Sequence, residues 1–268
     1  MSALILCYHS YRFGQPAYAD DDFIALDSDL AAIRRSGLPI VTAREIAEAL
    51  VGRRPWADVD RGIAITFDDG ACLDFSPFMH GSHGELRPFR DSLERHDAAA
   101  TSFVIASPDC RQRLEHEALS GEPMLGEDWW QPAVASSRFE IGNHSWDHNH
   151  GVMPGFAPGA DGRGSFLPIA NAQAAAWEID QAQDYIARAV GSPPALFAYP
   201  YGDVPPFVAT QYLPEAASRL GLLGAFTTEG CAVAPTTDPW RIPRVVCGDH
   251  WRSPEQFAAL LNSLRDNG

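Results

Sequence analysis

The sequence lacks any hydrophobic run long enough to cross a membrane, and it has few basic residues for its size. None of its apolar runs reaches the roughly 18 residues that a membrane-spanning helix needs. Its 20 lysines and arginines stand against 35 aspartates and glutamates, which gives a net charge of −15. We therefore predict no membrane span. We also predict no nucleic-acid partner, because this negative charge repels phosphate backbones and favours a neutral or cationic substrate.

The cysteines show no paired spacing, and the first residues do not show the pattern of a secretion signal. The five cysteines are widely spaced and form no C-x-x-C pair, which is typical of reduced core or loop residues, with a thiol nucleophile as the weaker alternative. Residues 3–8 offer only six apolar residues before His9, with no basic stretch and no small-residue cleavage site around them. We expect a first buried strand there and a cytoplasmic protein.

Short apolar runs alternate with amphipathic stretches along the chain. This alternation predicts βα repeats and a parallel sheet, and hence an α/β fold. The eight strand candidates are 3–9, 38–43, 62–67, 99–106, 138–144, 195–200, 222–228 and 242–247. The predicted helices are 27–36, 43–51, 86–95, 170–189, 214–220 and 253–264.

Two segments do not fit a compact repeat. Residues 71–85 and the Gly/Pro-rich residues 151–168 each follow a strand end that carries polar residues. Long loops at such places in α/β folds usually shape a substrate site. Apart from these two insertions we find no internal repeat and no linker, so we expect a single domain over residues 1–268.

Polar residues suited to chemistry stand at the ends of two predicted strands. Asp68 and Asp69 follow one strand, and His144 and His148 follow another. In parallel α/β barrels the working residues lie at the carboxyl ends of the strands, so these four are considered together. The H-x-x-x-H spacing brings two imidazoles to one side of a turn or loop. With one carboxylate they form a set that leaves coordination positions open for water and substrate.

The two adjacent carboxylates suit two different roles. One aspartate can bind a cation, and the cation then keeps its neighbour ionised and able to act as a general base toward water. Asp-Asp-Gly alone is typical of a strand-terminating turn, and a lone H-x-x-x-H is typical of a surface or core pair. Their joint occurrence at strand ends predicts a metal site. A third run ends near Tyr201, where a main-chain N–H can face a developing oxyanion.

These stretches resemble the first three motifs of the polysaccharide deacetylase family, also called carbohydrate esterase family four or NodB-like deacetylases. The motifs are TFDDG (66–70), HSWDH (144–148) and YPYG (199–202), in the family's order. Four further segments resemble family strands, so the likeness covers most of the chain. They are CYHS (7–10), ATSFVIA (100–106), EIGNH (140–144) and RIPRV (241–245).

The resemblance implies a distorted, TIM-barrel-like (β/α) barrel of about seven to eight parallel strands. It implies a hydrolase that removes acetyl groups from an N- or O-acetylated sugar or glycan with a divalent metal, most often Zn²⁺. Asp68 would be the base that activates water, and Asp69, His144 and His148 would hold the metal. The main-chain N–H of Tyr201 would join the metal in stabilising the oxyanion. Chain length, amide or ester specificity, and oligomeric state stay open.

One departure from the family pattern concerns the residue that tethers the base. The third motif often carries an arginine two residues before its proline, where this chain has Ala198. Arg244, at the start of the last strand run, is the candidate replacement, and Arg241 is the second candidate. A surface or structural role for Arg244 is the alternative.

A second departure concerns the acid that protonates the leaving group. The family's late Leu-x-His motif is absent as such, and His250 is the only histidine after residue 150. We take His250 as the candidate acid, with a surface loop residue as the alternative and with His9, His80 and His83 as further candidates. Without an acid an amine leaves poorly, whereas the alkoxide of an ester needs less help.

The leading functional hypothesis is therefore a metal-dependent deacetylase of a carbohydrate. A hydrolase of a non-sugar amide, such as a cyclic imide, is the alternative among enzymes. A non-catalytic carbohydrate-binding relative is the alternative of another class. Trp129 and Trp130 precede the fifth strand candidate and either stack on sugar rings or pack in the fold.

Overall fold

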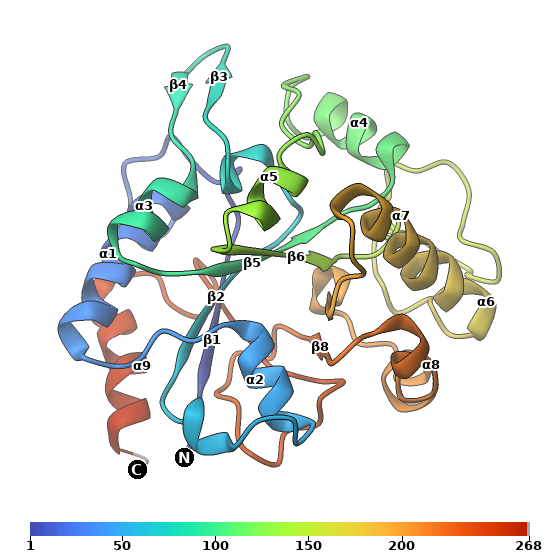
Figure 1. The fold of residues 1–268 in the computed structure, drawn as a ribbon. Coiled ribbons are helices and arrows are strands. Elements are labelled where there is room, and N and C mark those ends of the chain that lie inside the picture. The colour runs from blue at the N-terminus through green and yellow to red at the C-terminus, as the bar shows by residue number, and fades with distance from the viewer. Residues whose placement is uncertain (267–268) are drawn as a thin grey trace.

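The protein is described by a computed structural model, which describes residues 1–266. Its centre is a seven-stranded parallel sheet in the order β8-β7-β6-β5-β2-β1-β9 (Figure 1). The strands are β1 (Leu4–Tyr8), β2 (Ile63–Phe67), β5 (Ala100–Val104), β6 (Phe139–Asn143), β7 (Leu196–Ala198), β8 (Gly224–Phe226) and β9 (Val245–Val246).

The central strands are apolar along their whole length because both of their faces are covered. All five residues of β1 and all five of β2 are buried, as expected for a parallel sheet with helices on both sides. The two strands pair in register from Leu4 opposite Ile63 to Tyr8 opposite Phe67. Their carboxyl ends therefore lie side by side, and so do the residues that follow them.

The two edges of the sheet approach one another through the last strand run. Ile242 forms a parallel bridge with Phe226 at the end of β8, and β9, a few residues later, pairs with β1 at the other edge. One short segment thus contacts both edges, and the sheet curls into a distorted (β/α) barrel. The predicted fold class is confirmed.

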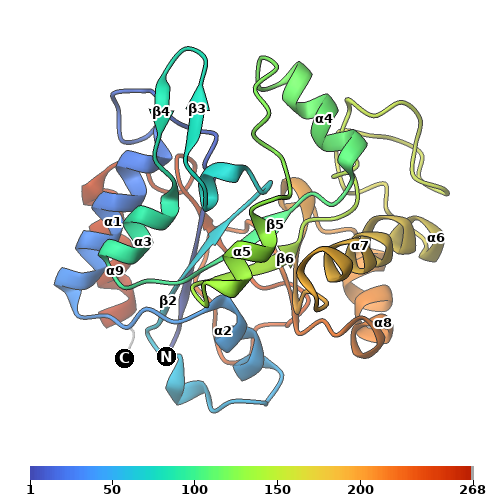
Figure 2. The same cartoon turned by 45° about the horizontal axis from the view of Figure 1, so that its top comes forward.

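Helices surround the sheet, and each predicted helix is present (Figures 1 and 2). They are α1 (Asp22–Ser36), α2 (Ala43–Leu50), α3 (Phe89–Arg95), α4 (Pro108–Glu117), α5 (Trp130–Ala135), α6 (Ala172–Ala175), α7 (Gln181–Val190), α8 (Leu213–Leu220) and α9 (Pro254–Asp266). Helix α1 begins earlier than predicted because the Asp21 carboxylate accepts from two main-chain N–H groups of its first turn. Within residues 1–266, no helix is both long and apolar enough to cross a membrane.

Helices α4 and α5 were not predicted from the sequence. The start of α4 nevertheless carries a recognisable signal, since Ser107 caps it by accepting from the N–H of Cys110, and Pro108 occupies its first position. Helix α5 is short and follows Trp129, which offers no side-chain cap. Trp129 and Trp130 are buried, so they pack in the core and do not form a sugar-stacking surface.

The second strand candidate, residues 38–43, does not form a strand. Ile40 makes only a single parallel bridge with Ile63. The chain then turns into α2, because Thr42 and Glu45 form a capping box at its start. Because α2 begins at Ala43, the segment before it is too short to form a strand.

The two long insertions differ in structure. Residues 71–85 contain the first strand of an antiparallel hairpin, β3 (Phe78–His80) with β4 (Gly84–Leu86), whereas residues 151–168 form no helix or strand. The hairpin and α4 stand at the end of the molecule opposite the N-terminus in both views (Figures 1 and 2). The loops that follow the strands are thus gathered at this end.

Candidate metal centre and surrounding pocket

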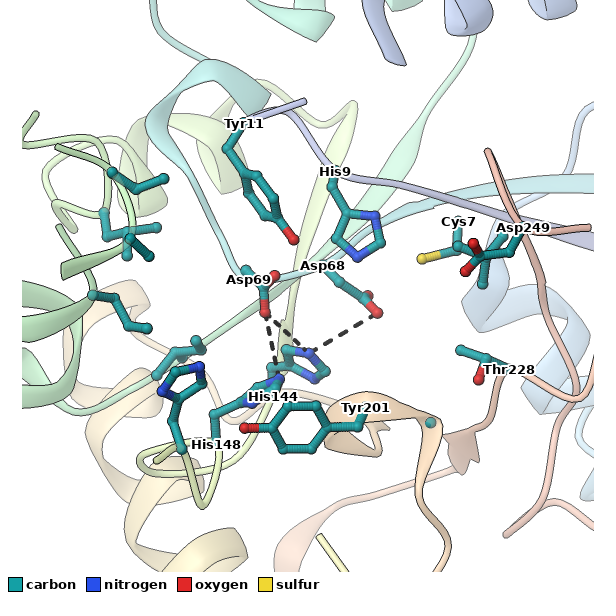
Figure 3. Close-up of a pocket in the computed structure, with 18 of the residues that line it drawn as sticks. Cys7, His9, Tyr11, Asp68, Asp69, His144, His148, Tyr201, Thr228 and Asp249 are labelled. Carbon is teal, nitrogen blue, oxygen red and sulfur yellow. Dashed lines mark ion pairs between the residues drawn. The ribbon is translucent and has the colours of Figure 1, made fainter. Parts of the chain in front are cut away.

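The carboxyl ends of the strands surround a cavity of about 610 Å³. Residues that follow β1, β2, β6, β7, β8 and β9 line it, among them the five residues predicted as base, metal ligands and oxyanion donor (Figure 3). They are Asp68, Asp69, His144, His148 and Tyr201. The fold thus brings together residues that lie more than 130 positions apart in the sequence.

Asp69, His144 and His148 converge on one point in this cavity. The Nε2 atoms of His144 and His148 each lie 3.5 Å from Oδ1 of Asp69, and one donor atom from each residue lies within 4.8 Å of the others. Figure 3 shows the three side chains directed toward one another. Two imidazole nitrogens and one carboxylate oxygen at these separations fit a divalent cation such as Zn²⁺.

Hydrogen bonds orient the ring of His144 and fix the backbone of His148. Nδ1 of His144 lies 2.9 Å from the carbonyl oxygen of Ala198. Donation to this carbonyl leaves Nε2 as the lone-pair atom that faces Asp69. The main-chain N–H of His148 donates to the Ser145 hydroxyl at 2.9 Å, which holds the loop between the two histidines in a compact turn.

The backbone adopts left-handed conformations where the ligand candidates leave their strands. Asp69, His148 and Tyr201 have φ values of 70°, 61° and 60°, which are uncommon for residues other than glycine and cluster at functional sites. Gly70 follows Asp69 at a φ of 72°, and a Cβ there would lie 2.7 Å from the Val104 side chain. The glycine therefore lets the chain turn sharply, so that both aspartates reach one cavity.

Asp68 is held by Arg244 from the last strand run. The Arg244 guanidinium donates from Nη1 and Nη2 to the two carboxylate oxygens, each at 2.6 Å. Arg244 also donates to the carbonyl of Thr227 and is fully buried. This forked contact fixes the orientation of the carboxylate. Arg241 lies at the surface near Glu229, so Arg244 is the arginine that contacts Asp68.

The charges around the site keep the carboxylates ionised. Burial raises the pKa of Asp68, but the charges of Arg244 and His144 outweigh burial and lower the pKa to about 2. Burial also raises the pKa of Asp69, yet the hydrogen bond that a protonated His144 donates and the charge of His148 bring it well below its usual value. Burial lowers the pKa of His144, but the charge of Asp68 and the hydrogen bond to Asp69 outweigh burial and raise it, so a bound metal would displace a proton from this ring. Burial, together with the charge of His144, lowers the pKa of His148 to about 3. Ionised carboxylates and a neutral imidazole are the forms that bind metals.

His9 and His250, two of the candidate acids, both line the pocket. His9 follows β1, and one of its ring nitrogens lies within 4.8 Å of a carboxylate oxygen of Asp68. His250 is exposed, and its Nδ1 accepts from the main-chain N–H of Val246. His80 and His83 lie instead on the β3–β4 hairpin and pack against Phe13.

The insertion 151–168 braces the loops that carry the candidate ligands, which sequence patterns alone did not indicate. Arg163 donates to the buried carboxylate of Asp147, between the two histidines, at 2.7 Å. Asn149, next to His148, donates to the carbonyls of Gly162 and Ser165. Ser165 in turn donates to Asp203, just after Tyr201. The insertion therefore links the loop after β6 with the loop after β7.

Comparisons with known proteins point to one family. The profile of the polysaccharide deacetylase family matches residues 57–223. No curated protein sequence matches the chain.

Solved structures show the same fold at low sequence identity. IcaB from Ammonifex degensii is 20% identical, with a TM-score of 0.68 over 98% of this chain and 97% of that chain. PplD from Streptococcus pyogenes, solved with acetate, is 19% identical, with a TM-score of 0.64 over 98% of both chains. The BpsB deacetylase domain from Bordetella bronchiseptica is 17% identical, with a TM-score of 0.61 over 92% of this chain and 96% of that chain.

Proposed function

Because the chain belongs to the polysaccharide deacetylase family, we propose that it removes acetyl groups from an acetylated sugar or glycan with the help of a divalent metal ion. The observation that carries this proposal is the convergence of Asp69, His144 and His148 beside an Asp68 carboxylate that Arg244 holds. Zn²⁺ is the ion that this donor set favours. When bound, it would supply Lewis acidity toward the acyl carbonyl and the attacking water.

The protein's own groups account for the proton transfers and for charge stabilisation. Asp68 takes the proton of the attacking water, and Arg244 holds its carboxylate in one orientation while favouring the ionised form. The main-chain N–H of Tyr201 donates to the carbonyl oxygen as negative charge develops there. Removing one such donor typically costs about 3–4 kcal/mol of transition-state stabilisation.

We propose His9 as the group that protonates the leaving amine, ahead of His250. His9 lies against Asp68, and its Nδ1 is buried without a hydrogen-bond partner among the described residues. It can therefore meet the leaving group at the reacting centre. His250 is exposed at the rim, with Nδ1 occupied by a backbone N–H.

Replacing His9 by asparagine is expected to lower kcat for an acetamide about 10²-fold or more. It should lower kcat for an activated acetyl ester much less, because a phenolate leaves without protonation. His250→Asn serves as the matched variant and should change both rates little. If His250→Asn instead lost kcat for the acetamide alone and His9→Asn lost none, His250 would be the group that protonates the leaving amine.

The proposed function is tested by acetate release and metal content. Metal-free protein should show no release from N-acetylated glucosamine oligomers or O-acetylated xylan, and one equivalent of Zn²⁺ should restore release from at least one of them. Elemental analysis after dialysis should find about one ion per chain. Turnover of cyclic imides by metal-free protein, or glycan binding without any acetate release, would contradict the proposal.

A further inference from the structure

Two groups of residues line opposite flanks of the cavity. On one side, a corner is formed by Cys7, Gly202, Thr228 and Val246, near the exposed Asp249. On the other side, an aliphatic wall is formed by Ile105, Leu114, Ala118, Leu119 and Leu125. Figure 3 shows Cys7 and Thr228 on one side of the candidate ligands, and side chains drawn only in carbon on the other side.

The corner is lined by small side chains. Cys7 is fully buried and Val246 is nearly so, whereas Gly202 and Thr228 are partly exposed and pack so closely that a Cβ on the glycine would overlap the threonine hydroxyl. An acetyl methyl group fits beside these side chains, which leaves the opposite flank for the rest of a substrate.

The aliphatic wall comes from Ile105, which follows β5, from α4 and from the segment after α4. Leu114 and Ala118 are four residues apart and therefore share one face of the helix. Leu114 and Leu125 pack in a small apolar cluster with Ile105, while Ala118 is exposed. The wall therefore runs from the buried floor of the cavity to the surface of the protein.

Hydrogen bonds hold the wall in place. Arg111 of α4 donates to the carbonyl of Leu125 at 2.9 Å, and Glu115 accepts from the main-chain N–H of Leu125 at 2.6 Å. The main-chain N–H of Cys72 donates to the carbonyl of Met124 at 2.6 Å. These hydrogen bonds connect the segment around Leu125 to α4 and to the loop after β2, so the position of the wall is fixed by the fold.

The wall is chemically unsuited to the hydroxyl groups of a polymeric sugar. Its five residues carry no side-chain donor or acceptor, and a desolvated hydroxyl without a partner weakens binding. A hydrocarbon chain gains affinity on the same surface, by about fourfold for each methylene that is buried.

We propose that the natural substrate is an acetylated amino sugar with an aliphatic aglycone that lies along the wall. This inference rests on the proposed function and specifies its substrate class. The acetyl group enters the corner beside Cys7, the sugar spans the reacting centre, and the chain contacts Leu114, Ala118 and Leu119.

The test compares the octyl and methyl β-glycosides of N-acetylglucosamine, with the octyl compound below its micelle-forming concentration. The two share the same amide and sugar, so the chain alone differs. We expect kcat/KM to be about tenfold or more higher for the octyl glycoside. The gain should lie in KM, because the wall does not touch the reacting atoms.

Two matched variants test whether the preference for the octyl glycoside depends on the wall. Ala118→Glu adds a charge to the exposed end of the wall and should reduce the octyl-to-methyl ratio to near one. Gln112→Glu adds the same charge to an exposed position of α4 that does not line the cavity and should leave the ratio unchanged. Equal rates for both glycosides in the unmodified protein would overturn the inference and leave the deacetylase function standing. Acetate release from neither these glycosides nor any acetylated glycan would refute the proposed function and this inference with it.

Discussion

Asp68→Asn is expected to lower kcat about 10³-fold while the protein still binds one metal ion per chain. Asparagine has nearly the shape of aspartate but cannot take a proton from water at neutral pH. The three candidate ligands are untouched by the change, so metal binding should persist. The measurement is acetate release under saturating Zn²⁺, combined with elemental analysis of the same sample.

The Asp68→Asn result needs a control for stability, because the substitution leaves the buried charge of Arg244 without its partner. Breaking a buried ion pair costs about 3–5 kcal/mol, so the melting temperature must be measured alongside the rate. Asp29→Asn is a comparison in which a buried aspartate becomes asparagine without leaving a cation unpaired. Asp29 is buried outside the pocket, accepts from Tyr8 and Trp251, and has its pKa raised by burial to about 7. If the folded Asp68→Asn protein released acetate as fast as the unmodified protein, another group would be the base.

His148→Ala is expected to abolish both metal binding and turnover. The substitution removes one of three donors that face a common point. Losing only an outer partner of a metal ligand typically costs 10–100-fold in affinity. Loss of the ligand itself should therefore exceed about 10²-fold. Titration with Zn²⁺ against a competing chelator measures the affinity, and acetate release at each metal concentration measures the linked activity.

His150→Ala provides the matched control for His148→Ala. His150 lies two residues further along the loop and lines the same cavity, yet it is not among the three convergent donors. Its removal should leave the metal affinity within a few-fold of that of the unmodified protein. Full metal affinity in a folded His148→Ala protein would mean that the ion binds elsewhere, and the proposed centre would be wrong.

The local sequence determined most of the strands and helices and the ligand candidates. Buried strands such as β2 are encoded by short apolar runs of β-forming residues, and Asp68 and Asp69 stand where such a run ends. The spacing of His144 and His148 is likewise a local feature. These features were predictable because the conformation of a short segment depends mainly on its own side chains and their periodicity.

Only the tertiary structure decided which distant groups meet. Arg244 contacts Asp68 across 176 positions of sequence; the sequence ranked it ahead of Arg241 but could not show the contact. It also could not show that His9 lies against Asp68, that residues 151–168 brace the ligand loops, or that Trp129 and Trp130 pack inside. Such contacts follow from strand order and from how the sheet curls, and those depend on the packing of the whole chain, which no short pattern encodes.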